Sequence, residues 1–222
     1  MLLISTLRLH KKTPPKIIIC GLAAGIIIVG DCYFSYYEKI GEIVTNISEE
    51  IPFTIPDGWQ YSRLSNVGSI VMGSSPSGTS INNESIGIEF HQGKICFTDM
   101  YITKSDKYTT EPTRIAEANS VLLCVRAPVG TTNITDREIC VGRGLSAIKP
   151  LSNISLLFLY YYLNVYKQRL ILQGTGSTFD AITANIVKNI LLPVPPLCEQ
   201  QKIVAAIQSH FDLLDSIKKS LE

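Results

Sequence analysis

Gln92 and Lys94 flank a glycine in a turn between two apolar runs, and their residue types point most directly to chemistry. A glutamine amide donates to and accepts from one adenine edge, and a lysine ammonium can hold a phosphate or a guanine. The turn is therefore a candidate for contact with double-stranded DNA. A polar hairpin tip would carry the same residues, and the sequence leaves both interpretations open.

Two arginines lie at turns that follow or interrupt apolar runs. Arg126 ends such a run at a Pro-Gly turn, and Arg143 lies between two glycines, which let backbone approach a partner closely. Either side chain could contact phosphate or brace a loop by bonding carbonyls, and for Arg126 we favour the brace. The remaining DNA-binding candidates are donors in polar stretches: Lys104, Lys107, Ser177 and Thr178.

Metal and catalytic motifs are missing from the sequence. The six cysteines form no C-x-x-C pair and have no ligand spacing with the three histidines, so we expect reduced thiols and no metal. No phosphate-binding glycine loop, H-E-x-x-H motif or nucleophile elbow is present. The sequence predicts no catalytic residue and no cofactor.

Short strands must position these candidates. Apolar runs separated by Gly, Pro, Ser and Asn clusters predict strands at 69–72, 86–90, 94–97, 121–125 and 139–141. We expect an α+β domain with a mixed, mostly antiparallel sheet. Trp59 is expected to anchor its core, and the aromatic run 158–163 to form a buried helix.

The C-terminal part predicts a short helix and then a long one. A donor-rich loop at 174–178 precedes helical apolar spacing over 181–190, and prolines over 193–196 predict extended chain. From about Leu197, apolar residues follow a heptad pattern typical of a coiled coil. This stripe predicts a subunit interface formed by Ile203, Ile207, His210, Phe211, Leu214, Ile217 and Leu221.

Composition and charge set wider limits. A chain of 222 residues, 45% of them hydrophobic, suits one core with appended arms, and a net charge of +1 is no nucleic-acid signature. Acidic residues gather ahead of the main domain, at Glu38, Glu42, Glu49, Glu50 and Asp57. The uncharged stretch 17–30 follows three lysines, but it is short for a membrane span, and we favour an irregular or buried arm.

The motif Leu192-Pro193-Val194-Pro195-Pro196-Leu197-Cys198-Glu199-Gln200-Gln201-Lys202-Ile203, preceded by Gly176-Ser177-Thr178-Phe179, resembles specificity subunits of type I restriction-modification enzymes. In that family it ends a target recognition domain and starts a helix that spaces two such domains. The segments 51–59, 90–97, 122–130 and 141–145 resemble further parts of the same domain.

The resemblance implies three regions: an atypical arm at 1–50, a target recognition domain at 51–197 and a spacer helix at 198–222. It implies a cytoplasmic, non-catalytic subunit that directs an adenine methyltransferase and, with a translocase subunit, an endonuclease. With one domain and one spacer helix, the chain looks like a half subunit that pairs with itself or with another half. The alternatives are a non-catalytic interaction fragment of such a subunit and a membrane-attached binding module.

Overall fold

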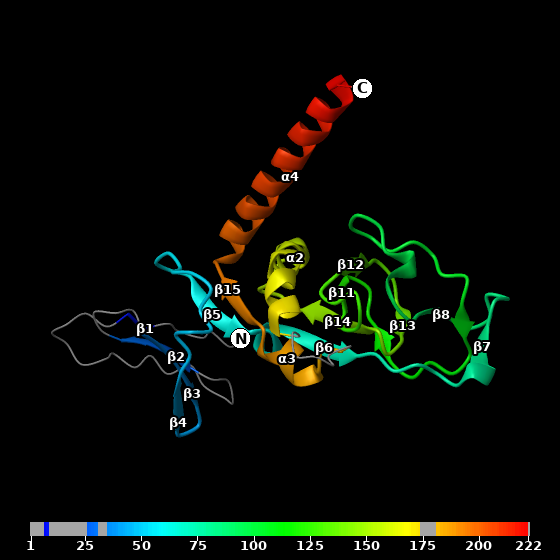
Figure 1. Cartoon of the computed structure of the whole chain (residues 1–222), viewed down its shortest axis with the longest axis horizontal. Helices are drawn as coiled ribbons and strands as arrows, with labels where there is room; N and C mark the ends of the chain where they lie inside the picture. Colours follow the sequence, from blue (N-terminus) through cyan, green and yellow to red (C-terminus); the bar gives the residue numbers. More distant parts are fainter. Residues whose placement is uncertain (1–6, 9–25, 31–34, 174–180, 222) are drawn as a thin grey trace. The chain divides into compact units, whose positions relative to one another are not determined.

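The computed structural model describes residues 7–8, 26–30, 35–173 and 181–221 (Figure 1). Two compact units emerge. Unit 1 comprises Met1–Asn66 and Asn189–Pro196, and unit 2 comprises Val67–Lys188 and Leu197–Glu222. Each unit is described below by itself.

Unit 1 contains a four-stranded sheet and a two-stranded sheet. The first has the order β1-β2-β3-β4, with strands Leu7–Arg8, Ile26–Gly30, Ser35–Ile40 and Ile43–Asn46. The second pairs β5 (Gln60–Arg63) with β15 (Leu191–Val194) in antiparallel register, so the extended segment expected around the prolines is confirmed. Pro193 lacks a backbone donor and fits here because the sheet has only two strands.

The core of unit 1 corrects one expectation. Tyr61 is fully buried and packs with Tyr36, Ile47 and Leu191, whereas Trp59 is half-buried and lies outside that cluster. Tyr61 lies within β5, where pairing with β15 carries its ring into the core, and its hydroxyl donates to the Phe53 carbonyl. The anchor is therefore two residues later than expected.

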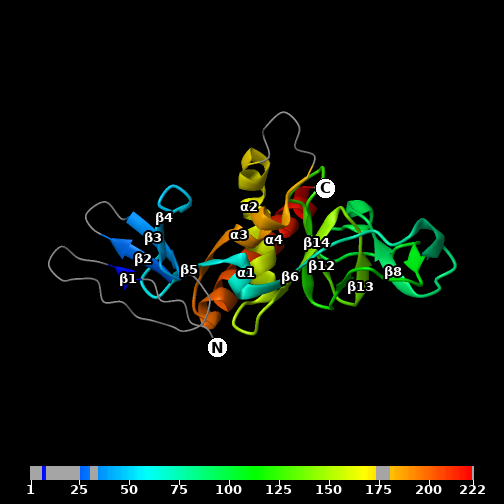
Figure 2. The ribbon, with the colours of Figure 1, turned by 90° about the horizontal axis from the view of Figure 1, so that it is seen from below.

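Unit 2 holds two further sheets (Figure 2). The order β12-β11-β14-β6 is wholly antiparallel, and β10-β13-β8-β9-β7 contains one parallel pair, β13 with β8. The strands are β6 (Gly68–Met72), β7 (Ile81–Asn82), β8 (Ile88–His91), β9 (Tyr108–Thr109), β10 (Ile115–Ala116), β11 (Ser120–Cys124), β12 (Thr132–Thr135), β13 (Ile139–Val141) and β14 (Leu145–Pro150). The expected mixed, mostly antiparallel α+β fold is confirmed.

The core of unit 2 is built on β11, whose five residues are all buried; the last four of them, 121–124, form a continuous apolar run rather than an alternating pattern. The buried cluster consists of Ile102, Ala116, Leu122, Cys124, Ile139, Val141, Leu145 and Ala147. Residues 94–97 are not the expected strand. They begin with the 3₁₀ turn η2 (Lys94–Cys96), because the Phe97 amide donates back to the Lys94 carbonyl.

The helices are α1 (Leu64–Val67), α2 (Leu156–Gln173), α3 (Ala184–Asn189) and α4 (Leu197–Leu221); a second 3₁₀ turn, η1, spans Gly78–Ser80. The aromatic run therefore lies in a helix as expected, and the last helix begins where the prolines end. Within the described residues, no helix combines the length and apolar character needed to cross a bilayer. Of the stretch 17–30, residues 26–30 form β2 and the rest lies outside the described residues.

Candidate nucleic-acid interface

A cleft of about 190 Å³ in unit 2 brings together four of the sequence-predicted residues. Its lining comes from the turn after β8, the end of β11 with the loop that follows, and the turn between β13 and β14. The lining residues are Gln92, Gly93, Lys94, Cys124, Arg126, Ala127, Pro128, Arg143 and Gly144. Residues far apart in the sequence thus meet at one surface.

The parallel pair β8 and β13 positions two sides of the cleft. Phe90 pairs with Cys140 and His91 with Val141, so both strands end at the same edge of the sheet. Beyond that edge the two turns remain bonded, because the Gly142 amide donates to the His91 carbonyl at 2.8 Å. The turns of Gln92 and Arg143 are consequently side by side.

The two glycines around Arg143 allow close approach of another segment of the same chain, the Gln92 backbone, rather than of a binding partner. A Cβ on Gly144 would lie 2.4 Å from the Gln92 carbonyl oxygen, and one on Gly142 would lie 2.9 Å from the Gln92 Cα. The Gly144 amide donates to that same carbonyl at 3.2 Å. Close approach was expected here, but its role is to join the two turns of the cleft.

The third side of the cleft is the loop after β11. The Val125 amide donates to the Gly144 carbonyl at 2.9 Å, which ties this loop to the Arg143 turn. Arg126 is exposed, and in the described part of the chain its guanidinium makes no side-chain hydrogen bond or ion pair. The brace that we favoured from the sequence is therefore not observed among these residues.

The charge of the cleft is positive. It contains the exposed side chains of Lys94, Arg126 and Arg143, and among the described residues that line it none is acidic. Burial raises the pKa of the Cys124 thiol to about 11, although the nearby Lys94 and Lys167 ammonium groups oppose that shift. The thiol is therefore neutral at pH 7, and the cations of the cleft are not balanced by it.

Lys167 is a nearby cation that the sequence reasoning missed. It lies on α2, and its stem packs against Gly130, where an added Cβ would lie 2.8 Å from the Lys167 Cγ. Gly130 has a φ of +80°, so the backbone there also favours glycine. A lysine within a mainly apolar helix was the one sequence feature that could have indicated it. Its position in the sequence does not show that it lies near Cys124.

A buried ion network supports the strand that leads into the cleft. The Glu89 carboxylate of β8 accepts bonds from Arg137 at 2.7 and 2.8 Å, from the Ser105 amide at 2.7 Å and from His91 Nε2 at 2.7 Å. Burial would raise the pKa of Glu89, but these hydrogen bonds outweigh it and lower the pKa to about 2. Burial also lowers the pKa of His91, so the imidazole is neutral at pH 7.

The remaining DNA-binding candidates lie outside the cleft lining. Lys104 and Lys107 are exposed on the segment between η2 and β9. Ser105 holds this segment to β8, because its hydroxyl donates to the Phe90 carbonyl. Ser177 and Thr178 fall in 174–180, outside the described residues.

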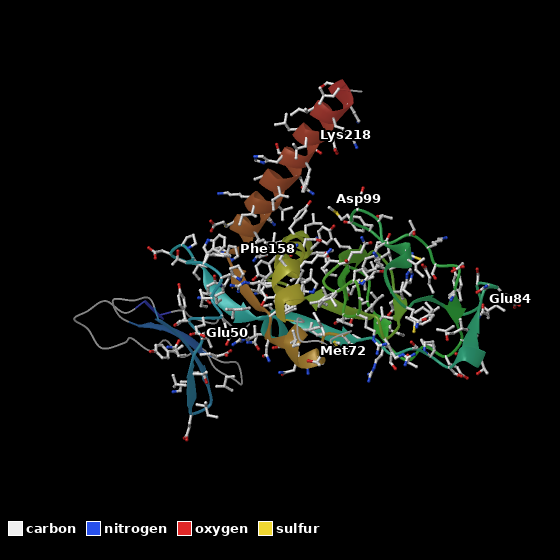
Figure 3. All side chains as sticks on the ribbon, in the orientation of Figure 1. Glu50, Met72, Glu84, Asp99, Phe158 and Lys218 are labelled. Carbon is white, nitrogen blue, oxygen red and sulfur yellow. The ribbon has the colours of Figure 1, made fainter. Side chains whose placement is uncertain are left out.

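The predicted interface on α4 divides into two halves. The first half packs on α2: Gln200 and Val204 are buried, Ile203 and Ile207 are half-buried, and Phe211 stacks on Tyr161 at 6.3 Å. The second half is exposed, and Figure 3 shows its side chains standing clear of the rest of unit 2, with Lys218 near the far end. The exposed stripe residues are His210, Leu214, Ile217 and Leu221.

Gln200 explains one position of the proline-containing motif. Its side chain is fully buried; its amide nitrogen donates to the Asn153 carbonyl at 3.0 Å, and its amide oxygen accepts from the Ser155 amide at 2.8 Å. Ser155 directly precedes α2, where backbone amides lack partners within the helix. Gln200 therefore satisfies the entry to α2 and anchors the start of α4 on it.

Comparison with known proteins gives consistent matches. The family described as "Type I restriction modification DNA specificity domain" matches residues 56–222. A putative type I restriction enzyme MjaX specificity subunit from Methanocaldococcus jannaschii is 36% identical over 171 residues, which cover 76% of this chain and 40% of that protein. The chain thus spans about two fifths of the length of this curated relative.

Two solved structures share both sequence and fold with the chain. The HsdS subunit from Thermoanaerobacter tengcongensis is 35% identical, with a TM-score of 0.68 and coverage of 76% of this chain and 41% of that one. A chain from a structure of the type I R-M system, described for complex assembly and conformational transition, is 36% identical, with a TM-score of 0.69 and coverage of 78% and 44%. The family match extends over more than half of the chain, and the protein belongs to the type I restriction-modification DNA specificity domain family.

Proposed function

We propose that this chain recognises a specific double-stranded DNA sequence as half of a specificity subunit. In this role it directs an adenine methyltransferase subunit and, with a translocase subunit, an endonuclease. The observation that carries the proposal is the cleft, which combines three exposed cations and one amide with no acidic residue among its described lining. Such a surface suits a polyanion that also displays hydrogen-bonding base edges.

The cleft residues have different tasks in this proposal. Lys94, Arg126 and Arg143 hold phosphates and set the register on the duplex, since phosphate contacts position a protein without reading sequence. Gln92 reads an adenine edge with its amide. Lys104, Lys107, Ser177 and Thr178 remain candidates for further contacts.

The region 51–197 serves as the target recognition domain, and 198–222 as the spacer helix. The chain itself carries no catalytic residue in this proposal, because methylation and cleavage belong to its partner subunits. It acts in the cytoplasm in this proposal.

The exposed half of α4 supports a proposal about assembly. Covering Leu214, Ile217 and Leu221 would contribute about 1.5 to 3 kcal/mol for each side chain that becomes fully buried, less the entropy of association. Pairing with a second copy, or with another half subunit, covers this face and supplies a second recognition domain. A two-fold symmetric pair would read an inverted repeat.

Co-expression with a methyltransferase subunit, followed by mapping of methylated adenines, tests the function. We expect methylation at one defined sequence, and with the purified chain we expect Lys94→Ala to weaken binding to all duplexes. Gln92→Ala should mainly relax the preference among sequences. Lys202→Ala, an exposed lysine on α4, is the matched control and should bind like the wild type.

An interaction fragment without its own target is the second candidate, favoured by the short span relative to the curated relative. Equal affinity for every duplex, together with no methylated sequence, would favour this reading and contradict target recognition. Light scattering tests the pairing separately, because Leu214→Asp should separate a self-paired chain into monomers. A monomeric wild type at tens of micromolar contradicts self-pairing and leaves a different partner chain.

A further inference from the structure

Ile95 directly follows Lys94 and is 95% exposed, more than any other large apolar side chain in the described residues. A single exposed apolar residue is ordinary on a protein surface. Ile95 differs in its location, since it projects from the rim of the cationic cleft without lining it. An apolar group held beside cations and an amide suggests a role in contacting the same ligand.

The turn that carries Ile95 is fixed at both ends. At its start, the Gln92 carbonyl accepts from the Gly144 amide at 3.2 Å. At its end, the Cys96 carbonyl accepts from the Thr103 amide at 2.9 Å and from the Thr103 hydroxyl at 3.2 Å. Ile95 is also β-branched, which restricts its side-chain rotamers. The backbone that carries Ile95 is therefore fixed before any ligand binds, and its side chain has few rotamers.

We propose that Ile95 contacts the methyl group of a thymine in the major groove and so contributes to the choice of target. The proposal rests on the proposed function and extends it to an apolar contact. Base edges in the major groove carry hydrogen-bonding groups and, on thymine, a methyl group. Since thymine pairs with adenine, its methyl group lies in the same groove as the adenine edge that Gln92 is proposed to read.

Deoxyuridine provides the test, because it pairs like thymine and lacks only the methyl group. Once the methylated sequence is mapped, duplexes are prepared with each thymine of the target replaced in turn by deoxyuridine. For the full-length wild-type chain, one replacement per half-site should weaken binding about fourfold, the value of one buried methyl group. Ile95→Ala should lose at least that much on unmodified DNA and show no further loss at the same position.

Two matched variants separate this contact from a general effect of truncation. Ile95→Val keeps most of the apolar surface and should keep the sensitivity to deoxyuridine. Val165→Ala removes a side chain that is 78% exposed on α2, and it should show the wild-type profile. Thermal unfolding of Ile95→Ala should match that of the wild type, because the Ile95 side chain is 95% exposed and its truncation removes almost no buried apolar surface.

Two outcomes overturn the inference while leaving target recognition intact. They are identical deoxyuridine profiles for wild type and Ile95→Ala, and a uniform loss of affinity with no dependence on the thymine methyl. The last outcome would indicate an apolar wedge between base steps instead. Failure of the proposed function looks different, since no preferred sequence would then exist for any variant.

Discussion

Arg63 of unit 1 and the cleft arginines Arg126 and Arg143 of unit 2 have opposite surroundings. In unit 1, Arg63 is buried; it bonds both oxygens of Glu38 at 2.7 to 3.3 Å, Glu50 at 2.6 Å and the Asn189 carbonyl at 2.9 Å. In unit 2, Arg126 and Arg143 are exposed at a cleft whose described lining contains no acid. The first set of donors is used inside the protein, whereas the second set has no acidic partner among the described residues that line the cleft.

We propose that this difference separates a structural cation from one that binds a ligand. A buried guanidinium with satisfied donors joins chain segments and has no capacity left for phosphate. An exposed guanidinium beside other cations stays hydrated in the free protein, and it gains an ion pair when an anion binds. Arg63 is the last residue of β5 and Arg126 lies two residues after β11, so residue type and proximity to a strand end do not distinguish them.

The largest effect on stability is expected when Arg63 is removed from its buried ion pairs. Arg63→Met leaves the Glu38 carboxylate, which is 8% exposed, without its partner, and unfolding should become easier by about 3 to 5 kcal/mol. Urea denaturation measures this loss. Arg126→Met is the matched control and should change the free energy of unfolding by less than about 0.5 kcal/mol. Equal stability of the two variants would show that Arg63 contributes no more to folding than Arg126 does.

Unit 2 also contains a paired arginine, Arg137, and its ion pair makes the stability of the protein depend on pH. Arg137 and its neighbours lower the pKa of Glu89 to about 2, from an ordinary value of 4.5. A lowered pKa in the folded state stabilises the protein above pH 4.5, and this contribution is lost as the pH falls from 4.5 towards 2.

Glu89→Gln should therefore flatten the pH dependence of unfolding in that range, with an amplitude of about 1 to 2 kcal/mol after allowance for solvent screening. Denaturation at a series of pH values, with Glu84→Gln as an exposed control, measures the amplitude. A wild-type slope that survives in Glu89→Gln would assign the acid sensitivity to another carboxylate.

The smallest effect is expected at the exposed arginines, and it concerns binding. Arg126→Ala and Arg143→Ala should each weaken DNA binding about fivefold, the scale of one exposed ion pair, and leave stability unchanged. Each loss should reduce the slope of log affinity against log salt by about 0.9. Titrations at several salt concentrations measure both values. An unchanged slope in both variants would place the phosphate contacts elsewhere.

Local patterns in the sequence predicted several elements closely. The apolar run at 139–141 is β13 itself, and the last helix begins at Leu197, directly after the prolines. These features depend on neighbouring residues, because apolar runs and proline stereochemistry act over a few positions. Residues 94–97 were predicted as a strand because their apolar residues fit one. The backbones of Gly142 and Gly144, which approach the preceding residues Gln92 and Gly93, are distant in sequence, so the pattern did not indicate a turn there.

The sequence by itself determined the family motif, the fold class and most candidates for DNA contact, because residue type and short spacing carry that information. Only the tertiary structure decided which cations are free. The acidic cluster ahead of the domain was visible, but its pairing with Arg63 was not, and Lys167 showed no sign of its proximity to Cys124. Charge pairing and burial depend on side chains brought together over long sequence separations, and a linear pattern does not record those distances.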